Sequence, residues 1–229
     1  MTFFQRLQSE TTAERSYLLA APAILDCQRA VVPRQRYVAF LTEAYHHVKH
    51  TVPLLMAVGS RLRADQRWLF DAVVEYIDEE KGHDEWILSD IAACGADAEA
   101  VRHGLPHRST ELMVSYAWDS VCRLNPVSFF GMVYVLEGTS VNLATPMAGI
   151  IQQTLGLPPQ AMTYLTSHGA LDQSHIGFFE KLMLQLEAPA DQAAVLHMAR
   201  RMFVLYGDVF RSLTEQETTQ AQPSAGVLA

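Results

Sequence analysis

The stretch HGALDQSH, residues 168–175, places two histidines and an aspartate at positions i, i+4 and i+7. On an α-helix these steps leave His168, Asp172 and His175 within roughly 40° of one another, so the three side chains share one stripe. The following residues, GFFEKLMLQL, are strongly apolar and predict that this helix packs into a core. The three side chains are therefore either part of an internal metal site or polar residues at the solvent edge of the helix.

The rest of the chain is typical of a helical protein. Of its 229 residues 49% are hydrophobic and only 18% are charged, which is enough apolar surface for a sizeable core. A 3.6-residue periodicity recurs throughout, and there is almost no strand signal. We therefore expect an all-α, single-domain bundle of seven to eight helices over residues 1–216. The polar and small residues of 217–229 predict a disordered tail.

Proline, glycine and capping residues set the expected helix limits. We expect a kink at Pro53 and a helix end at Gly95. The expected helices cover about 12–31, 34–62, 64–94, 110–125, 126–156, 168–186 and 190–216.

Charge and cysteine content restrict the function classes. The net charge is −8, which argues against a general nucleic-acid binder because such proteins need a basic surface. No stretch matches a membrane helix and the N-terminus lacks a signal-peptide pattern, so we expect a cytoplasmic protein without a membrane partner. Cys27, Cys94 and Cys122 lie far apart in apolar or helical sequence, and we expect buried, reduced thiols.

A second group of candidate ligands lies in EEKGHDEW, residues 79–86. Glu80 and His83 are three residues apart, so on one helix both could reach the same metal ion. Glu79 is four residues before His83 and is an alternative ligand. Gly82 is unfavourable inside a helix, and a close approach of another element or a local bulge that re-aims His83 would explain it.

Glu137 is the most informative single residue. It lies in GMVYVLEGTSVNL and is the only charged residue between Arg123 and Asp172. A buried carboxylate normally pairs with a cation, coordinates a metal or stays protonated. We interpret Glu137 as a metal ligand, with a buried arginine partner as the alternative.

The segment EAYHHVKH, residues 43–50, adds weaker candidates. Glu43 is a possible supplementary ligand, whereas its neighbours His46, His47 and His50 are better interpreted as groups behind the ligands or at the surface. A substrate pocket could use Tyr45, Tyr134 and Phe178, together with Met132, Leu143 and Met147. The same side chains would serve equally well as plain core.

Taken together, the predicted metal ligands are Glu80, His83, Glu137, His168, Asp172 and His175. Six ligands of mixed oxygen and nitrogen type are too many for one catalytic zinc. They suit two iron or manganese ions in a helix bundle, with Glu137 between the ions and positions left open for dioxygen or substrate.

This pattern resembles the heme-oxygenase-like diiron oxidases, from the second expected helix to the helix of 168–186. The resemblance implies two Fe(II) ions, dioxygen and a small organic substrate such as an amino acid, an amine or a fatty-acid-like molecule. Heme oxygenases share the fold but use an axial histidine near the N-terminus, and residues 1–45 contain none, so no heme is expected. The alternatives are a metal-free enzyme similar to TenA or to the cofactorless oxidase of pyrroloquinoline quinone synthesis, and a non-catalytic helical protein. A homodimer is compatible with the sequence but does not follow from it.

Overall fold

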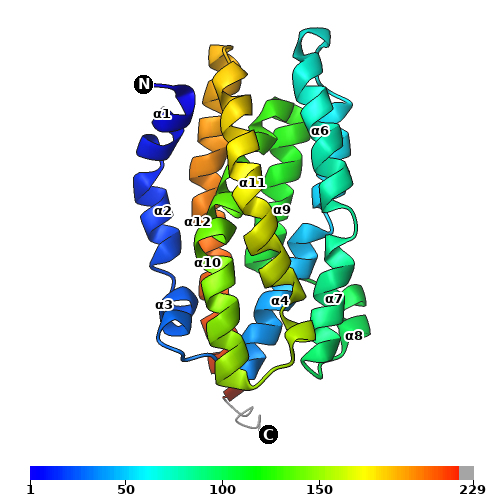
Figure 1. Cartoon of the computed structure of the whole chain (residues 1–229), viewed down its shortest axis with the longest axis vertical. Coiled ribbons are helices and arrows are strands. Elements are labelled where there is room, and N and C mark those ends of the chain that lie inside the picture. Colours follow the sequence, from blue (N-terminus) through cyan, green and yellow to red (C-terminus); the bar gives the residue numbers. More distant parts are fainter. Residues whose placement is uncertain (222–229) are drawn as a thin grey trace, which may run out of the picture.

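The computed structural model describes residues 1–221, except for the side chains of 168–174 and 215–221. In this part of the chain all regular structure is helical, and twelve α-helices form one bundle (Figure 1). The all-α bundle expected from the sequence is confirmed. The helices are α1 (Phe3–Glu10), α2 (Thr12–Leu19), α3 (Pro22–Gln28), α4 (Arg34–Val48), α5 (Thr51–Gly59), α6 (Arg67–Glu80), α7 (His83–Ala93), α8 (Ala98–His103), α9 (Arg108–Asp119), α10 (Phe129–Leu155), α11 (Thr163–Gln185) and α12 (Pro189–Ala221).

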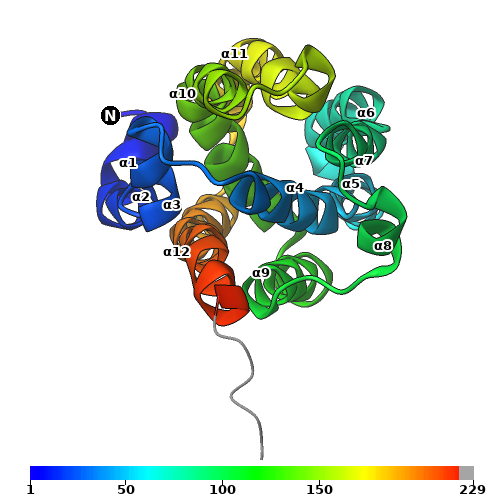
Figure 2. The same cartoon turned by 90° about the horizontal axis from the view of Figure 1, so that it is seen from below.

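The long helix α10 packs against both α11 and α12. Seen from below, α10 and α11 lie side by side, and α1–α3 form a group on one flank beside α10 and α12 (Figure 2). Gly131 explains how closely α10 approaches α12, because a Cβ at this position would lie 2.3 Å from the carbonyl oxygen of Val195. Only glycine fits this contact.

The helix number exceeds the expected seven to eight because three predicted helices are broken and because the short helices α1 and α8 lie outside the predicted ones. The N-terminal region contains three short helices, the first capped by Thr2 and Gln5, instead of one helix over 12–31. The predicted kink at Pro53 is wrong. The break lies earlier, at Lys49 and His50, and Pro53 occupies the first turn of α5, where its missing N–H is tolerated.

The third predicted helix ends at Lys81 and restarts after Gly82. This glycine has φ +90°, in the left-handed region, and a Cβ there would meet nothing within 4 Å. Gly82 is therefore required for the backbone turn, not for the close approach of another element. The turn places Glu80 at the end of α6 and His83 at the start of α7.

The C-terminal helices are longer than expected. α11 begins at Thr163, five residues before the predicted start, and α12 continues to Ala221, past the predicted domain limit at residue 216. Residues 222–229 of the predicted tail lie outside the described part.

The described cysteines and the apolar helix α10 can also be placed. Cys27 and Cys94 are buried as expected, but Cys122 is exposed, because it lies on a short π-helical turn after α9. Among the described residues one helix, Pro126–Leu155, is long and apolar enough to cross a membrane by length and composition, and 67% of its apolar window is buried inside the protein. That burial is typical of a core helix.

Candidate metal centre

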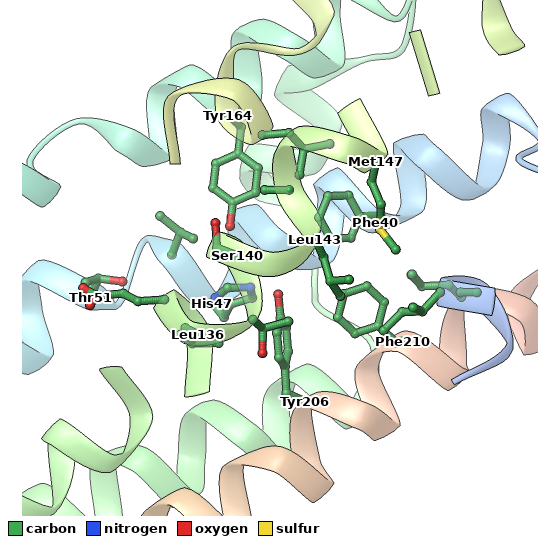
Figure 3. Close-up of a pocket in the computed structure, with 18 of the residues that line it drawn as sticks. Phe40, His47, Thr51, Leu136, Ser140, Leu143, Met147, Tyr164, Tyr206 and Phe210 are labelled. Carbon is green, nitrogen blue, oxygen red and sulfur yellow. The ribbon is translucent and has the colours of Figure 1, made fainter. Parts of the chain in front are cut away.

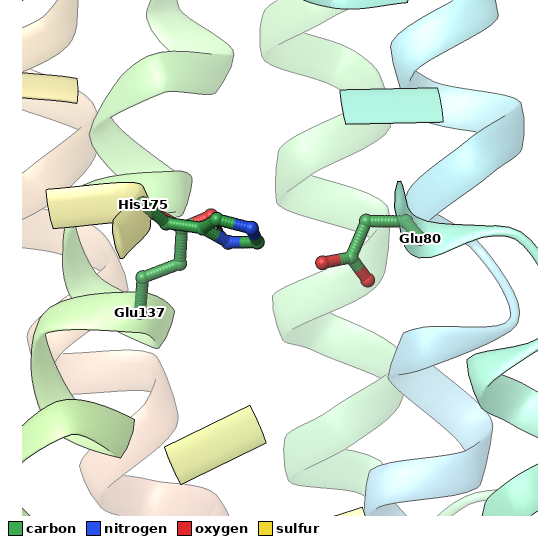
Figure 4. A group of neighbouring side chains, drawn as sticks. All are labelled: Glu80, Glu137 and His175. Carbon is green, nitrogen blue, oxygen red and sulfur yellow. Dashed lines mark ion pairs between the residues drawn. The ribbon is translucent and has the colours of Figure 1, made fainter. Parts of the chain in front are cut away.

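Three of the predicted ligands converge in the core. Glu80 from the end of α6, Glu137 from the middle of α10 and His175 from α11 each bring one ligand atom within 4.8 Å of the others (Figure 4). Glu137 is 9% exposed and His175 is 3% exposed. Residues up to 95 positions apart in the sequence therefore form one compact, buried donor group.

Carboxylates approach the His175 imidazole from two sides. Its Nδ1 lies 3.4 Å from Oε1 of Glu137, and its Nε2 lies 3.0 Å from Oε2 of Glu79. The ring edge also contacts the ring of Tyr76, with 6.0 Å between the centroids. Packing and charge thus fix the orientation of the imidazole.

The break between α6 and α7 brings His83 back toward Glu80. Nδ1 of His83 lies 3.1 Å from Oε2 of Glu80, and the ring stacks on Trp86 with 4.2 Å between the centroids. The predicted pairing of Glu80 with His83 is therefore present. Its structural basis differs from the expectation, because the two residues belong to different helices.

The donor set fits a metal ion in the iron or manganese class. Carboxylate oxygens and imidazole nitrogens are the mixed donors that such ions take in helix bundles. Two acids this close together in a low-dielectric core repel each other unless positive charge lies between or beside them. A divalent ion held by Glu80, Glu137 and His175 would supply that charge.

An elongated cavity opens from this centre into the bundle. Glu80 and Glu137 are part of its wall, and its volume is about 140 Å³. The wall is mainly apolar (Figure 3). Helices α4, α5, α10 and α12 supply most of it, so residues at the centre face a space suited to a small organic molecule.

A family model described as iron-containing redox enzyme matches residues 38–207. The chain belongs to this family. The matched region contains all six predicted ligands and most of the cavity wall. No curated protein matches the chain.

Several solved structures of other proteins have a fold similar to that of this chain. A domain of unknown function with a heme oxygenase-like fold from Shewanella denitrificans OS217 is 24% identical, covers 100% of this chain and 99% of its own, and has a TM-score of 0.85. A TenA homologue from Pseudomonas syringae is 12% identical, with 93% of each chain covered and a TM-score of 0.79. Heme oxygenase-2 from Synechocystis, in complex with heme and NO, is 13% identical, with 96% of this chain and 88% of that chain covered and a TM-score of 0.75.

The remaining predicted ligands have different outcomes. The side chains of His168 and Asp172 lie outside the described residues, although their backbone belongs to α11 as expected. Glu43 is buried but is not part of the Glu–Glu–His group, and both its carboxylate oxygens accept the backbone N–H of His107, at 3.1 and 3.2 Å. The structure therefore uses Glu43 to hold the start of α9.

The histidines of α4 are not at the surface. His46 and His47 are 1% and 2% exposed. Nδ1 of His46 contacts Nζ of Lys49 at 3.0 Å, whereas His47 lies in the cavity wall with its ring edge against Tyr206. Of the two positions expected for His47, behind the ligands or at the surface, the surface position is wrong, because the ring is part of the cavity wall.

The predicted pocket residues divide into two groups. Met132, Leu143 and Met147 do line the cavity. Tyr45, Tyr134 and Phe178 are not part of the wall. Tyr45 is buried under Lys49, the hydroxyl of Tyr134 accepts a hydrogen bond from Arg15, and Phe178 packs on Tyr76.

The helical spacing on α10 could have predicted which of its residues line the cavity. Counting along α10 from Glu137 in steps of three or four reaches Ser140, Leu143 or Ala144, Met147 and Ile151, all of which line the cavity. Tyr134 follows the same spacing backwards but faces the core, because the cavity wall continues there through Val133 instead.

Proposed function

We propose that this chain is a non-heme di-iron oxidase or oxygenase that uses dioxygen to oxidise a small organic substrate. The observation that carries the proposal is the position of Glu80 and Glu137. Both belong to the Glu–Glu–His donor group and to the wall of the cavity. Metal ions held there would lie directly beside a bound substrate.

The ligand set proposed for the two ions is Glu80, His83, Glu137, His168, Asp172 and His175. Positions 168 and 172 share a helical face with His175 on α11, which supports their inclusion. Glu79, already in contact with His175, is a supplementary ligand. Two Fe(II) ions would supply the electrons that reduce dioxygen.

The chain's own residues provide the surroundings for that chemistry. The cavity wall excludes water from the substrate and holds it against Glu80 and Glu137. Tyr76 holds the His175 ring in place, and the stacked Trp86 does the same for His83. A fixed ligand orientation is needed if the ions are to keep open positions.

Two observations favour this proposal over the alternatives within the fold. A TenA-like reaction through a cysteine needs a thiolate, but burial raises the pKa of Cys94 to about 11 and also raises the pKa of Cys27. Heme bound as in heme oxygenases needs a histidine near the N-terminus, and α1, α2 and α3 contain none. The family's iron is therefore assigned to the Glu–Glu–His group.

The test is the iron content of the purified chain. After metal removal and anaerobic loading with Fe(II), the wild-type protein should retain about two iron ions per chain. His175→Ala and Glu137→Gln should each lose at least half of that iron, whereas His103→Ala, an exposed histidine on α8, should retain it. Dioxygen consumption on mixing with air should follow the iron content.

The opposite result would reject the proposal. Less than one iron ion per chain in the wild-type protein, or full iron content in His175→Ala, would show that the donor group does not hold the metal.

A further inference from the structure

A second cleft lies between the end of α9 and the start of α12. Its volume is about 450 Å³, within the range of small-molecule sites. Among the described residues it shares no wall residue with the cavity beside Glu80 and Glu137. The cleft is therefore a separate site, and the proposed function does not account for it.

Two serines of its wall carry buried hydroxyl groups without a partner. Ser120 and Ser128 are 3% and 4% exposed, and neither Oγ has a hydrogen-bond partner among the described residues. A buried hydroxyl normally forms a hydrogen bond, and leaving it unpaired lowers stability. A ligand in the cleft would supply the missing acceptors.

Local structure offers each serine an intramolecular role that it does not take. Ser120 begins the π-helical turn Ser120–Leu124, and its hydroxyl does not bond to the carbonyl four residues earlier, as helical serines often do. Ser128 precedes α10, but its side chain does not cap that helix. Single π-helical turns occur frequently at functional sites. Both hydroxyls are thus available to a ligand.

The polar residues of the wall can donate hydrogen bonds. Besides the two serines they include Arg123, His197 and Tyr116, and no Asp or Glu of the described chain lines the cleft. Hydroxyl and guanidinium groups are donors that suit a carboxylate. The cleft therefore favours an oxyanion, although the whole chain has a net charge of −8.

Acidic neighbours limit how much negative charge the cleft can accept. Nη1 of Arg123 is ion-paired to Oδ1 of Asp119 at 3.0 Å. The wall residue Asn125 donates from Nδ2 to the buried Asp191 carboxylate at 2.8 Å, and Arg63 pairs with the same carboxylate. These two acids and two arginines sum to zero, so a monoanion fits better than a doubly charged phosphate.

The α12 side of the cleft is apolar. Ala190, Ala194 and Met198 follow at four-residue spacing and so present one face of α12 to it. Leu124, on the π-helical turn, is 72% exposed and also lines it. A ligand in the cleft therefore gains affinity from an apolar body beside its anionic group.

We propose that this cleft binds a small monocarboxylate with an apolar body. The carboxylate accepts hydrogen bonds from Ser120 and Ser128 and is attracted by Arg123, and the body of the ligand lies against Ala190, Ala194 and Met198. The site is independent of the metal centre and goes beyond the proposed function.

The test is calorimetric titration of the full chain with benzoate, in the metal-free and the Mn(II)-loaded protein. Benzoate should bind with a dissociation constant of about 1 mM or tighter, equally in both forms. Benzamide has the same shape without the charge, and it should bind at least about tenfold more weakly. Inorganic phosphate should also bind at least about tenfold more weakly, because of its second charge.

Two pairs of variants locate the site. Ala190→Trp should weaken benzoate binding at least about tenfold by filling the cleft, whereas Ala193→Trp, exposed on α12 but outside the wall, should not. Arg123→Gln should weaken it about fivefold. Arg201→Gln, an exposed arginine of α12 outside the wall, is the matched control.

The serines have a signature that a purely structural role would not give. Ser120→Ala and Ser128→Ala should each weaken benzoate binding about tenfold. Neither should lower the stability of the ligand-free protein, because each removes an unpaired buried hydroxyl. Ser89→Ala, at an exposed serine on α7, should leave the affinity unchanged.

Several results would overturn the proposal. They are the absence of benzoate binding up to roughly 10 mM, equal binding of phosphate, full affinity in Ala190→Trp, and serine variants that lose stability but keep affinity. Binding that requires Mn(II), or that is lost in Leu143→Trp, would place benzoate in the main cavity and would also overturn it. Iron content does not enter these measurements, so the proposal and the proposed function can fail separately.

Discussion

Glu137 places a carboxylate on the long, largely apolar helix α10. It is 9% exposed and lies within ligand distance of Glu80 and His175. A second acid at this distance raises the free energy of the folded state unless a cation compensates it. Metal binding and folding stability should therefore be linked at this residue.

The first prediction uses that linkage. Mn(II), which is not oxidised under these conditions, should raise the free energy of unfolding of the metal-free protein by about 2.7 kcal/mol at a concentration 100-fold above its dissociation constant. Glu137→Gln should abolish the gain, because the amide removes one anionic ligand. Chemical denaturation with and without Mn(II) measures it.

The control is Glu180→Gln, which changes an exposed acid on α11. This variant should keep the gain. An equal gain in Glu137→Gln would contradict the assigned role of Glu137.

His46 gives a second prediction at the residue scale. Burial, together with the nearby charges of Lys49 and His50, lowers its pKa from 6.5 to about 4. The folded protein thus favours the neutral ring, and the associated stability is complete above pH 6.5 and is lost as the pH falls toward 4. Between pH 7 and pH 5 this amounts to about 2 kcal/mol.

Comparison of His46→Gln with the wild type measures the effect. The wild type should lose about 2 kcal/mol more stability than His46→Gln when the pH falls from 7 to 5. His103→Gln, at an exposed position, should behave like the wild type. Identical pH dependence of His46→Gln and wild type would show that this ring does not titrate as described.

At the level of single residues, the sequence was most informative where one residue was chemically isolated. Glu137 stood out because its segment holds no other charge. Glu43 could not be interpreted in the same way, because its partner is the backbone N–H of His107, 64 positions away. A hydrogen bond to a backbone group cannot be predicted from the spacing of side chains in the sequence.

At the scale of elements, the break between α6 and α7 shapes the candidate centre. Gly82 adopts φ +90° and redirects the chain so that His83 returns to Glu80. If one helix continued through residue 82, the side chains of Glu80 and His83 would be oriented differently relative to each other. The turn is thus part of the construction of the site.

Gly82→Ala should lower the free energy of unfolding by about 1 kcal/mol, because an L-residue is strained at this φ. The open space around the position means that the cost is backbone strain alone. Gly149→Ala is the matched control, since Gly149 lies inside α10 with equally open surroundings and should gain up to about 1 kcal/mol. Denaturant titration of both variants measures the difference, and equal effects would contradict the role of the turn.

The sequence predicted elements better than their ends. Gly82 was recognised as unusual because glycine is unfavourable in a helix. The break at Lys49 and His50 has no glycine or proline to mark it, and the nearby Pro53 misled the prediction because it lies five residues beyond Val48, the last helical residue of α4. Tertiary packing sets such a break, and local propensity does not reveal it.

At the scale of the whole molecule, composition and periodicity were sufficient for the all-α bundle. The cavity was not predictable in the same way, because it is the space left between α4, α10 and α12. These helices are far apart in the sequence, and which of their faces meet depends on the completed packing. The family resemblance indicated the order of the candidate ligands along the chain. The structure shows which helices line the cavity beside them.

The central claim is that two non-heme irons lie beside this cavity. Anomalous X-ray diffraction at the iron edge, from crystals of anaerobically Fe(II)-loaded protein, tests it most directly. The account predicts two iron peaks within bonding distance of Glu80, Glu137 and His175, with His83, His168 and Asp172 completing the ligands. A single iron in a porphyrin, or iron peaks away from these side chains, would contradict it.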